Sequence, residues 1–327
     1  MKIKYNVNTV AFSTLCRGPV RLWLACLLSM VILLGAAGCN EQAKKTVPFT
    51  FGAAADVQYG DKDTAGARNY RKSIESLESC VADFNSRELA FVIQLGDLVD
   101  GGSGVAADYD NILSVYNRIR TDKYHVLGNH DFTGIARTAV LKKLGMTEAY
   151  YDFEKFGWRF VVLDPMELSI AGGWPESSEN LRLGRRIYEE LQKKKAPNAV
   201  PWCGALGADQ LQWLKSVLAD ADSKKQKVVV FAHHALMPEN NGHNIWNAED
   251  VVEILESCDG MVAYINGHRH PGGYMERNGI HYITIEGIVE APKENAYAFV
   301  KVSDDGIEIE GVGKTPDRNL AIRERAK

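Results

Sequence analysis

Five short polar clusters in the sequence contain the residue types that bind divalent metal ions. Each cluster follows a run of apolar and β-branched residues, and none of the five contains a cysteine. The carboxylates, amides and imidazoles that they contribute are Asp56, Gln58, Asp97, Asn129, His130, His233, His268 and His270. Oxygen and imidazole donors without a thiolate suit Mn, Fe or Zn in mixed coordination, and they do not suit a structural cysteine-rich zinc site.

The apolar runs before the clusters predict buried strands. They cover residues 49–55, 89–95, 123–127, 227–232 and 261–265, and apolar residues at helical spacing lie between them, over 74–84, 211–218 and 251–255. Strands that alternate with helices are typical of an α/β fold, in which functional sites form at the carboxyl ends of the strands. We therefore expect the five clusters to converge on one rim and to share a metal site.

The later part of the chain has a different pattern. Residues 150–163 predict a β-hairpin, and the segments from Met275 to Val312 predict antiparallel strands joined by turns. These elements indicate a second, mixed sheet. Residues 165–205 interrupt the alternation of strands and helices. An insertion of this length at the same rim is a candidate cap over the site.

Taken together, the polar clusters form a motif pattern that resembles the calcineurin-like metallophosphoesterase family. The motifs are Asp56-x-Gln58, Gly96-Asp97-x-x-Asp100, Gly128-Asn129-His130-Asp131, His233 and Gly267-His268-x-His270. The resemblance spans residues 49–312. It implies an α/β (α+β) four-layer sandwich, in which helices flank two mixed β-sheets and a dinuclear metal site lies at the carboxyl-terminal tips of the strands.

The resemblance also implies a role for each motif residue. Asp56, Gln58, Asp97 and His270 would hold one divalent metal, and Asp97, Asn129, His233 and His268 would hold the other. The two ions would lower the pKa of a bridging water, which would supply a hydroxide to attack phosphorus. His130 would protonate the leaving group or stabilise the transition state, and Asp100 would orient His130. Asp131 is expected to hold the motif loop.

One motif residue indicates which branch of the family the chain resembles. Gln58 stands where the family more often has histidine, and its amide oxygen shifts the metal preference toward Mn²⁺, with Fe or Zn as alternatives. The sequence resembles the manganese-dependent ADP-ribose/CDP-alcohol diphosphatases more closely than other branches, over residues 56–59, 68–71, 207–214 and 267–274. It departs from that branch at Trp202-Cys203-Gly204, where Asn-Gly is expected, and this departure leaves the choice of substrate open.

The expected activity is therefore hydrolysis of the pyrophosphate bond in small nucleotide derivatives such as ADP-ribose or CDP-alcohols. A phosphomonoesterase or phosphodiesterase that acts on other extracytoplasmic phosphates is an alternative. A non-catalytic, metal-binding surface lipoprotein is another. The complete ligand set, together with His130 and Asp100, argues against the last of these.

The first 39 residues predict a targeting segment. Residues 22–38 carry no charge and follow Arg17 and Arg21, and this run is short for a membrane span. It ends in Ala36-Ala37-Gly38-Cys39, which resembles a bacterial lipobox with a lipidated cysteine. An uncleaved anchor and ordinary secretion are the alternatives. All three interpretations place the rest of the chain, which we call the body (residues 40–327), outside the cytoplasm. Residues 40–48 are expected to be a tether and residues 313–327 a C-terminal tail.

The charge balance excludes one class of partner. The chain of 327 residues has 38 basic and 42 acidic side chains, and its net charge of −4 becomes −8 without residues 1–39. So acidic a body is a poor general nucleic-acid binder. We expect a small phosphorylated or nucleotide substrate, with membrane contact only through the N-terminal lipid or anchor, and the sequence leaves the oligomeric state open.

Three cysteines and one further histidine are residue types that often bind metals, but they lie outside the five polar clusters or next to a predicted ligand without a role of their own. Cys80, Cys203 and Cys258 show no metal-ligand spacing, and buried apolar positions are at least as well supported for them. His234 lies on the other face of its strand from His233, so we expect it to pack or to donate a hydrogen bond.

Overall fold

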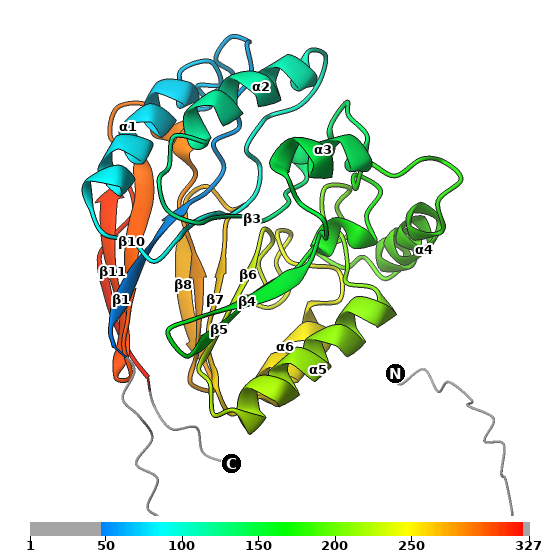
Figure 1. Ribbon diagram of the computed structural model, residues 1–327. Helices are drawn as coiled ribbons and strands as arrows, with labels where there is room; N and C mark the ends of the chain where they lie inside the picture. Colours follow the sequence, from blue (N-terminus) through cyan, green and yellow to red (C-terminus); the bar gives the residue numbers. More distant parts are fainter. Residues whose placement is uncertain (1–46, 323–327) are drawn as a thin grey trace, which may run out of the picture. The chain divides into compact units, whose positions relative to one another are not determined.

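The computed structural model describes residues 47–322, which form four layers in the order helix, sheet, sheet, helix (Figure 1). The predicted targeting segment and most of the predicted tether lie outside the described residues. No helix between residues 47 and 322 is both long and apolar enough to cross a membrane. Within the described part, the predicted fold class, two mixed sheets flanked by helices, is confirmed.

The first sheet has the strand order β12-β11-β10-β1-β2-β3. Its strands are β1 (Phe49–Ala54), β2 (Val92–Gln94), β3 (Lys123–His125), β10 (Ala296–Val302), β11 (Gly306–Gly313) and β12 (Arg318–Ala321). β1, β2 and β3 run parallel, whereas β10 pairs antiparallel with β1. Helices α1 (Ser73–Ser86) and α2 (Val105–Tyr116) cover the outer face of this sheet (Figure 1). The parallel strands therefore end at one edge.

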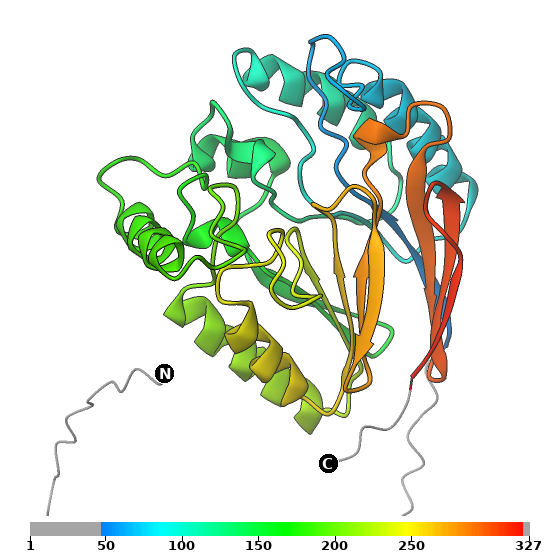
Figure 2. The same cartoon turned by 180° about the vertical axis from the view of Figure 1, so that it is seen from behind.

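The second sheet has the strand order β4-β5-β6-β7-β9-β8. Its strands are β4 (Tyr151–Lys155), β5 (Trp158–Val162), β6 (Val228–Ala232), β7 (Met261–Asn266), β8 (Gly273–Arg277) and β9 (Ile280–Thr284). β5, β6, β7 and β9 are parallel, and antiparallel hairpins close both edges. Helices α5 (Ala208–Ser223) and α6 (Ala248–Glu256) cover the outer face (Figure 2).

Aromatic side chains fill the space between the two sheets. Phe51 and Phe91 of the first sheet stack with ring centroids 4.7 Å apart, and Phe160 and Phe231 of the second meet the Phe51 ring edge-on at 5.9 and 5.8 Å. All four side chains are fully buried. Inner faces that interdigitate in this way hold two sheets in a fixed orientation, which fixes the strand ends relative to one another.

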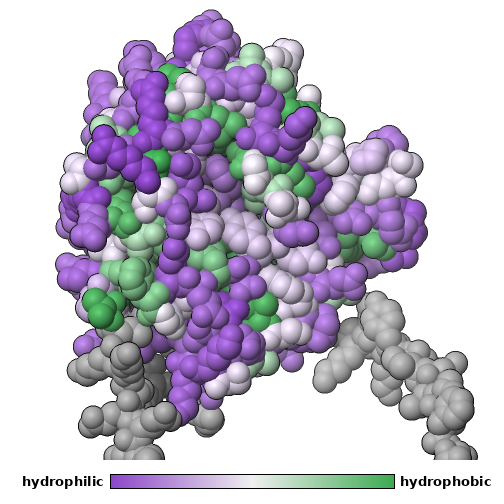
Figure 3. Space-filling model, in the orientation of Figure 1, coloured by the Kyte–Doolittle hydropathy of each residue, from purple (hydrophilic) through white to green (hydrophobic). Residues whose placement is uncertain are grey.

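The remaining elements lie in the connections between strands. They are the short 3-10 helices η1 (His130–Phe132), η2 (Pro165–Glu167) and η3 (Ile288–Glu290) and the helices α3 (Arg137–Leu144) and α4 (Glu179–Lys193). The predicted insertion, residues 165–205, contains η2 and α4. Asp164, next to it, forms a buried ion pair with Arg137 of α3. In the orientation of Figure 1, the described surface is mostly hydrophilic, with small hydrophobic areas scattered over it (Figure 3).

Two expectations about the end of the chain need correction. Of the strands predicted between Met275 and Val312, β10 and β11 join the first sheet beside β1, and only β8 and β9 join the second. The fold also continues past residue 312, where a tail was expected, because β12 pairs antiparallel with β11. Leu320 of β12 lies opposite Ile307 and is buried in the core between the sheets. This apolar contact explains why the chain stays on the sheet as far as Ala321.

Candidate metal centre

The strand ends bring the predicted ligands to one rim. Asp56 and Gln58 follow β1, Asp97 follows β2, Asn129 follows β3, His233 follows β6, and His268 and His270 follow β7. All of these strands are parallel within their own sheets, and the packing of the two sheets places both sets of ends together. The convergence expected from the alternation of strands and polar clusters is therefore observed.

Asp97 lies at the middle of this group. Its Oδ2 atom is 3.1 Å from His233 Nε2 and accepts a hydrogen bond of 3.2 Å from the Gln58 amide. Its Oδ1 atom accepts a hydrogen bond of 2.8 Å from the backbone N–H of His130. A carboxylate that contacts groups on both sides has the placement that a bridging ligand needs.

The other predicted ligands lie around Asp97 in two sets. On one side, His270 Nε2 is 3.4 Å from Asp56 Oδ1 and 3.3 Å from Gln58 Nε2. On the other, His268 Nδ1 is 3.2 Å from His233 Nε2. The backbone N–H of His268 donates to Asp56 Oδ2 over 2.9 Å, which connects the two sets.

Several donor atoms at this rim are buried and have no hydrogen-bond partner among the described residues. These atoms are Asp56 Oδ1, Gln58 Oε1 and Asn129 Oδ1. Buried polar atoms are rarely left unsatisfied, and each one found needs an explanation. Carboxylate and amide oxygens beside imidazole nitrogens are the donors that Mn²⁺ and related divalent ions take. The residues therefore fit the metal ions that the motif pattern implies.

The electrostatics of the rim are those of a site for positive charge. Burial alone raises the pKa of the Asp97 carboxyl, but the neighbouring His233 and His130 side chains outweigh it and hold this pKa well below its usual range. Burial lowers the pKa of His233, but Asp97 and Asp56 outweigh it and raise this pKa to about 9. A metal ion would displace that proton, because imidazole binds metals only in its neutral form.

Outer partners fix the orientation of two of the imidazoles. His233 Nδ1 lies 2.8 Å from the Leu95 carbonyl, and His270 Nδ1 lies 2.8 Å from Glu290 Oε1. Each contact leaves Nε2 facing the rim, and such partners also raise the basicity of a ligating imidazole. Sequence reasoning did not identify Glu290, which ends η3 and reaches His270 only through the fold. Arg68 lies 3.5 Å from Glu290.

His130 and Asp100 form a separate pair beside the predicted ligands. His130 Nδ1 is 3.1 Å from Asp100 Oδ1 and 3.0 Å from the Asp100 carbonyl oxygen. The His130 side chain is 25% exposed, whereas that of Asp100 is buried. Lys62, which sequence reasoning also missed, forms an ion pair with the other Asp100 oxygen, Oδ2. The predicted contact between Asp100 and His130 is therefore present.

The backbone at the rim is unusual. Asp56, Gln58, Asp97 and His268 have φ angles of 51°, 41°, 55° and 67°, in the left-handed region that non-glycine residues rarely adopt. A Cβ atom at Gly128 would collide with the Asp97 carboxylate. The sharp turns after β1, β2 and β7 thus point these side chains into a common space.

Asp131 holds these turns together, as the sequence predicted. Its carboxylate accepts hydrogen bonds from three backbone N–H groups, those of Gly128 at 2.8 Å, Asp97 at 3.0 Å and Leu98 at 2.9 Å. The side chain is fully buried. Asp131 therefore joins the turn after β2 to the turn after β3 and does not face the space between the ligands.

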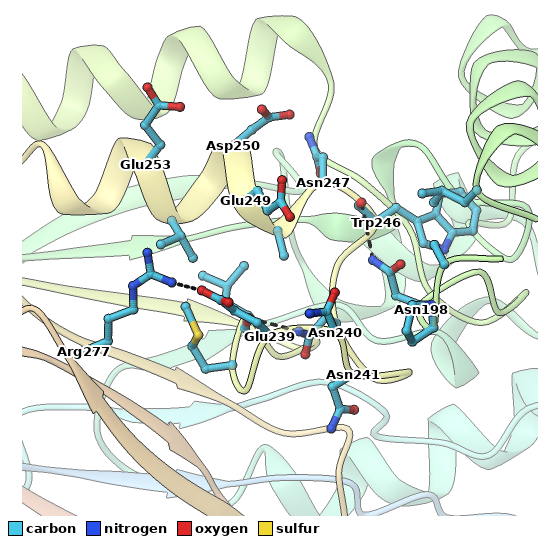
Figure 4. Close-up of a pocket in the computed structure, with 18 of the residues that line it drawn as sticks. Asn198, Glu239, Asn240, Asn241, Trp246, Asn247, Glu249, Asp250, Glu253 and Arg277 are labelled. Atoms are coloured by element: carbon cyan, nitrogen blue, oxygen red, sulfur yellow. Dashed lines mark hydrogen bonds and ion pairs between the residues drawn. The ribbon is translucent and has the colours of Figure 1, made fainter. Parts of the chain in front are cut away.

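A cavity of about 900 Å³ lies near the rim but contains none of the predicted ligands (Figure 4). It is lined by the end of α4, the loop before α6 and α6 itself. Five carboxylates line it, those of Glu239, Glu249, Asp250, Glu253 and Glu256, together with the cations of Lys194 and Arg277, and Arg277 pairs with Glu239 and Glu256. The excess of negative charge repels a phosphate anion, so the cavity does not compete with the rim as a phosphate site.

Comparison with known proteins agrees with this geometry. The family model of the calcineurin-like phosphoesterases matches residues 49–272. A manganese-dependent ADP-ribose/CDP-alcohol diphosphatase from Arabidopsis thaliana is 31% identical over 296 residues, which cover 81% of this chain and 94% of that protein. The protein of the same name from Homo sapiens is 30% identical over 325 residues, which cover 85% of this chain and 94% of that protein.

A solved structure shows the same fold. The crystal structure of a dimetal phosphatase from Danio rerio matches with a TM-score of 0.77 and 29% sequence identity, over 84% of this chain and 99% of that chain. The names of these relatives agree with the expected manganese cofactor and pair of metal ions, and they do not support a non-catalytic lipoprotein. The chain belongs to the calcineurin-like phosphoesterase family and is a hydrolase, a metallophosphoesterase.

Proposed function

We propose that this protein hydrolyses the pyrophosphate bond of small nucleotide derivatives, with ADP-ribose and CDP-alcohols as the expected substrates, and that it uses two Mn²⁺ ions. The observation that carries the proposal is the group of unsatisfied, buried oxygen donors that lies beside the His130–Asp100 pair. The names of relatives that align with more than four-fifths of the chain support the substrate class.

The two sets of side chains around Asp97 would hold the ions. Asp56, Gln58, Asp97 and His270 would hold one ion, and Asp97, Asn129, His233 and His268 would hold the other. When bound, the ions would supply Lewis-acid polarisation of the phosphoryl oxygens and an activated water. The amide oxygen of Gln58 makes its site harder than a third imidazole would, which favours Mn²⁺.

His130 supplies the proton that the leaving oxygen needs. Nδ1 of the ring is hydrogen-bonded to the Asp100 carbonyl oxygen at 3.0 Å and lies 3.1 Å from the Asp100 carboxylate, which leaves Nε2 to face the substrate. Lys62 holds the Asp100 carboxylate from its other oxygen, so the position of the ring is set from two directions. The partial exposure of His130 is what a proton donor at the mouth of a site requires.

We also infer that the body is held outside the cytoplasm by a lipid on Cys39. The support is the uncharged run 22–38, which ends in small residues before that cysteine. Free secretion is the alternative.

Product analysis tests the proposed reaction. The purified protein, stripped of metal with a chelator, should produce AMP and ribose phosphate from ADP-ribose only after Mn²⁺ is added. The Asp97→Asn variant should bind less Mn²⁺ and lose this activity, because it lacks the proposed bridging carboxylate. If free phosphate is released from monoesters instead and ADP-ribose stays intact, the phosphomonoesterase alternative replaces the proposal.

Replacing His130 separates catalysis from metal binding. His130→Ala should bind Mn²⁺ as the wild type does but lower kcat by roughly 10²–10⁴-fold, the usual scale for the loss of a general acid. Asp100→Asn should lower kcat in the same direction by a smaller factor, because the ring remains but loses its fixed orientation. Full turnover by His130→Ala would contradict the role given to this side chain.

Fractionation of cells tests the anchor. The wild type should sediment with membranes and incorporate labelled fatty acid, whereas Cys39→Ser should carry no label. Equal labelling of the two proteins would show that Cys39 is not the lipidated residue.

A further inference from the structure

A second group of metal-binding side chains shares His268 with the predicted dinuclear centre. One ligand atom each of Cys203, His234 and His268 lie within 4.8 Å of one another. Cys203 and His234 are fully buried. The three residues come from different parts of the chain: the end of the 165–205 insertion, the end of β6 and the end of β7. Neither Cys203 nor His234 has a role in the proposed phosphohydrolase reaction.

The ring nitrogens of this group are incompletely satisfied. His234 Nε2 lies 2.9 Å from the Trp202 carbonyl, but its Nδ1 is buried and has no hydrogen-bond partner within residues 47–322. His268 is likewise half-satisfied: its Nδ1 contacts His233, whereas its buried Nε2 has no partner in the described chain. Two unsatisfied, buried nitrogens beside one buried thiol need a common explanation.

A fourth donor lies at the border of the group. The ring centroid of His243 is 5.1 Å from that of His268, and the His234 centroid is 4.2 Å from it. Nδ1 of His243 is also buried and unpartnered in the described structure. A set of one cysteine and three histidines contains the donor types that zinc prefers in four-coordinate sites.

We infer that Cys203, His234 and His268, with His243 or a water in the fourth position, form a third metal site that takes a borderline-soft divalent ion such as Zn²⁺. This site is distinct from the two Mn²⁺ positions because it contains a sulfur donor, which hard ions avoid. His268 would join the two centres, because its Nδ1 contacts His233 and its buried Nε2 has no partner among the described residues. The inference does not depend on which phosphate ester the protein hydrolyses.

Binding of the ion must release protons. Without a metal, the Cys203 thiol donates a hydrogen bond of 3.5 Å to the Gly242 carbonyl. When the sulfur–metal bond forms, the thiol proton passes to solvent. The Nε2 proton of His268 leaves in the same way when Nδ1 is already committed to the dinuclear centre, so two protons are released for each ion bound.

The site would fasten the insertion to the rim. Cys203 belongs to the insertion, whereas His234 and His268 follow central strands of the second sheet. The adjacent Trp202 is 43% exposed, and its carbonyl already accepts from His234. A metal bond at Cys203 would therefore fix this exposed indole at the edge of the phosphate site. The spacing of these residues along the chain does not indicate such a site, because only the fold brings them together.

Cobalt substitution tests the site directly. The full chain is loaded with Mn²⁺ and then titrated with Co²⁺, while the thiolate-to-cobalt charge-transfer absorption and the metal content per chain are measured. Wild type should develop this absorption and bind one ion more than Cys203→Ser, which should show none. Cys258→Ser is the matched control, since Cys258 is a buried cysteine that contacts Asp222 and does not belong to the group of Cys203, His234 and His268. It should behave as wild type.

Two results would overturn the inference. One is the absence of the charge-transfer absorption in wild type, and the other is its persistence, with the same metal content, in Cys203→Ser. If circular dichroism shows that Cys203→Ser does not fold, His234→Asn takes its place and should also bind one ion fewer than wild type. Both readouts are independent of turnover, so a failure here is distinguishable from a failure of the proposed phosphohydrolase function.

Discussion

A fully buried carboxylate, that of Asp97, must be compensated from several directions before the two sheets can pack around it. Its oxygens contact His233, the Gln58 amide and the backbone of His130, and Asp131 accepts from its backbone N–H. An isolated charge in such surroundings costs several kcal/mol. His233, the Gln58 amide and the His130 N–H are therefore placed to offset this charge. The Asp131 carboxylate instead adds a second negative charge nearby, and burial together with repulsion from Asp97 raises the pKa of Asp131. Divalent ions extend the same compensation, because they replace the proton that His233 otherwise holds.

The same rim stores backbone strain. Four of the predicted ligands have positive φ angles, and such conformations cost on the order of 1–3 kcal/mol each in non-glycine residues. They persist only where the surroundings fix them. The aromatic packing between the sheets and the three hydrogen bonds of Asp131 do so here. The strained turns point the donors at one another, so the stability of the sandwich and the geometry of the site are linked.

The strand-end clusters could be predicted from the sequence because they are local. A buried strand followed by a polar motif is visible as an apolar run and a residue pattern, and the parallel arrangement then implies convergence. Asp131 could be assigned for the same reason, since it lies inside the motif whose turn it holds. The placement of β10 beside β1 could not be predicted, because antiparallel strands late in the chain fit either sheet equally well by pattern.

The residues that contact the predicted ligands and Asp100 from outside the site could not be predicted from the sequence for a related reason. Glu290 reaches His270, and Lys62 reaches Asp100, through contacts that only the assembled fold creates. Cys203 and His234 likewise meet because the insertion returns to the rim, and neither residue has ligand spacing along the chain. Local chemistry could thus be identified from residue types, whereas the residues that orient it depend on long-range packing.

We propose that Asp97 bridges two metal ions at the meeting point of the two sheets. Anomalous diffraction from crystals of the Mn²⁺-loaded protein measures this directly. We expect two manganese peaks on either side of the Asp97 carboxylate, one beside Gln58 and His270 and the other beside Asn129 and His233. A single peak, or peaks in the acidic cavity next to α6 with none at Asp97, would contradict it.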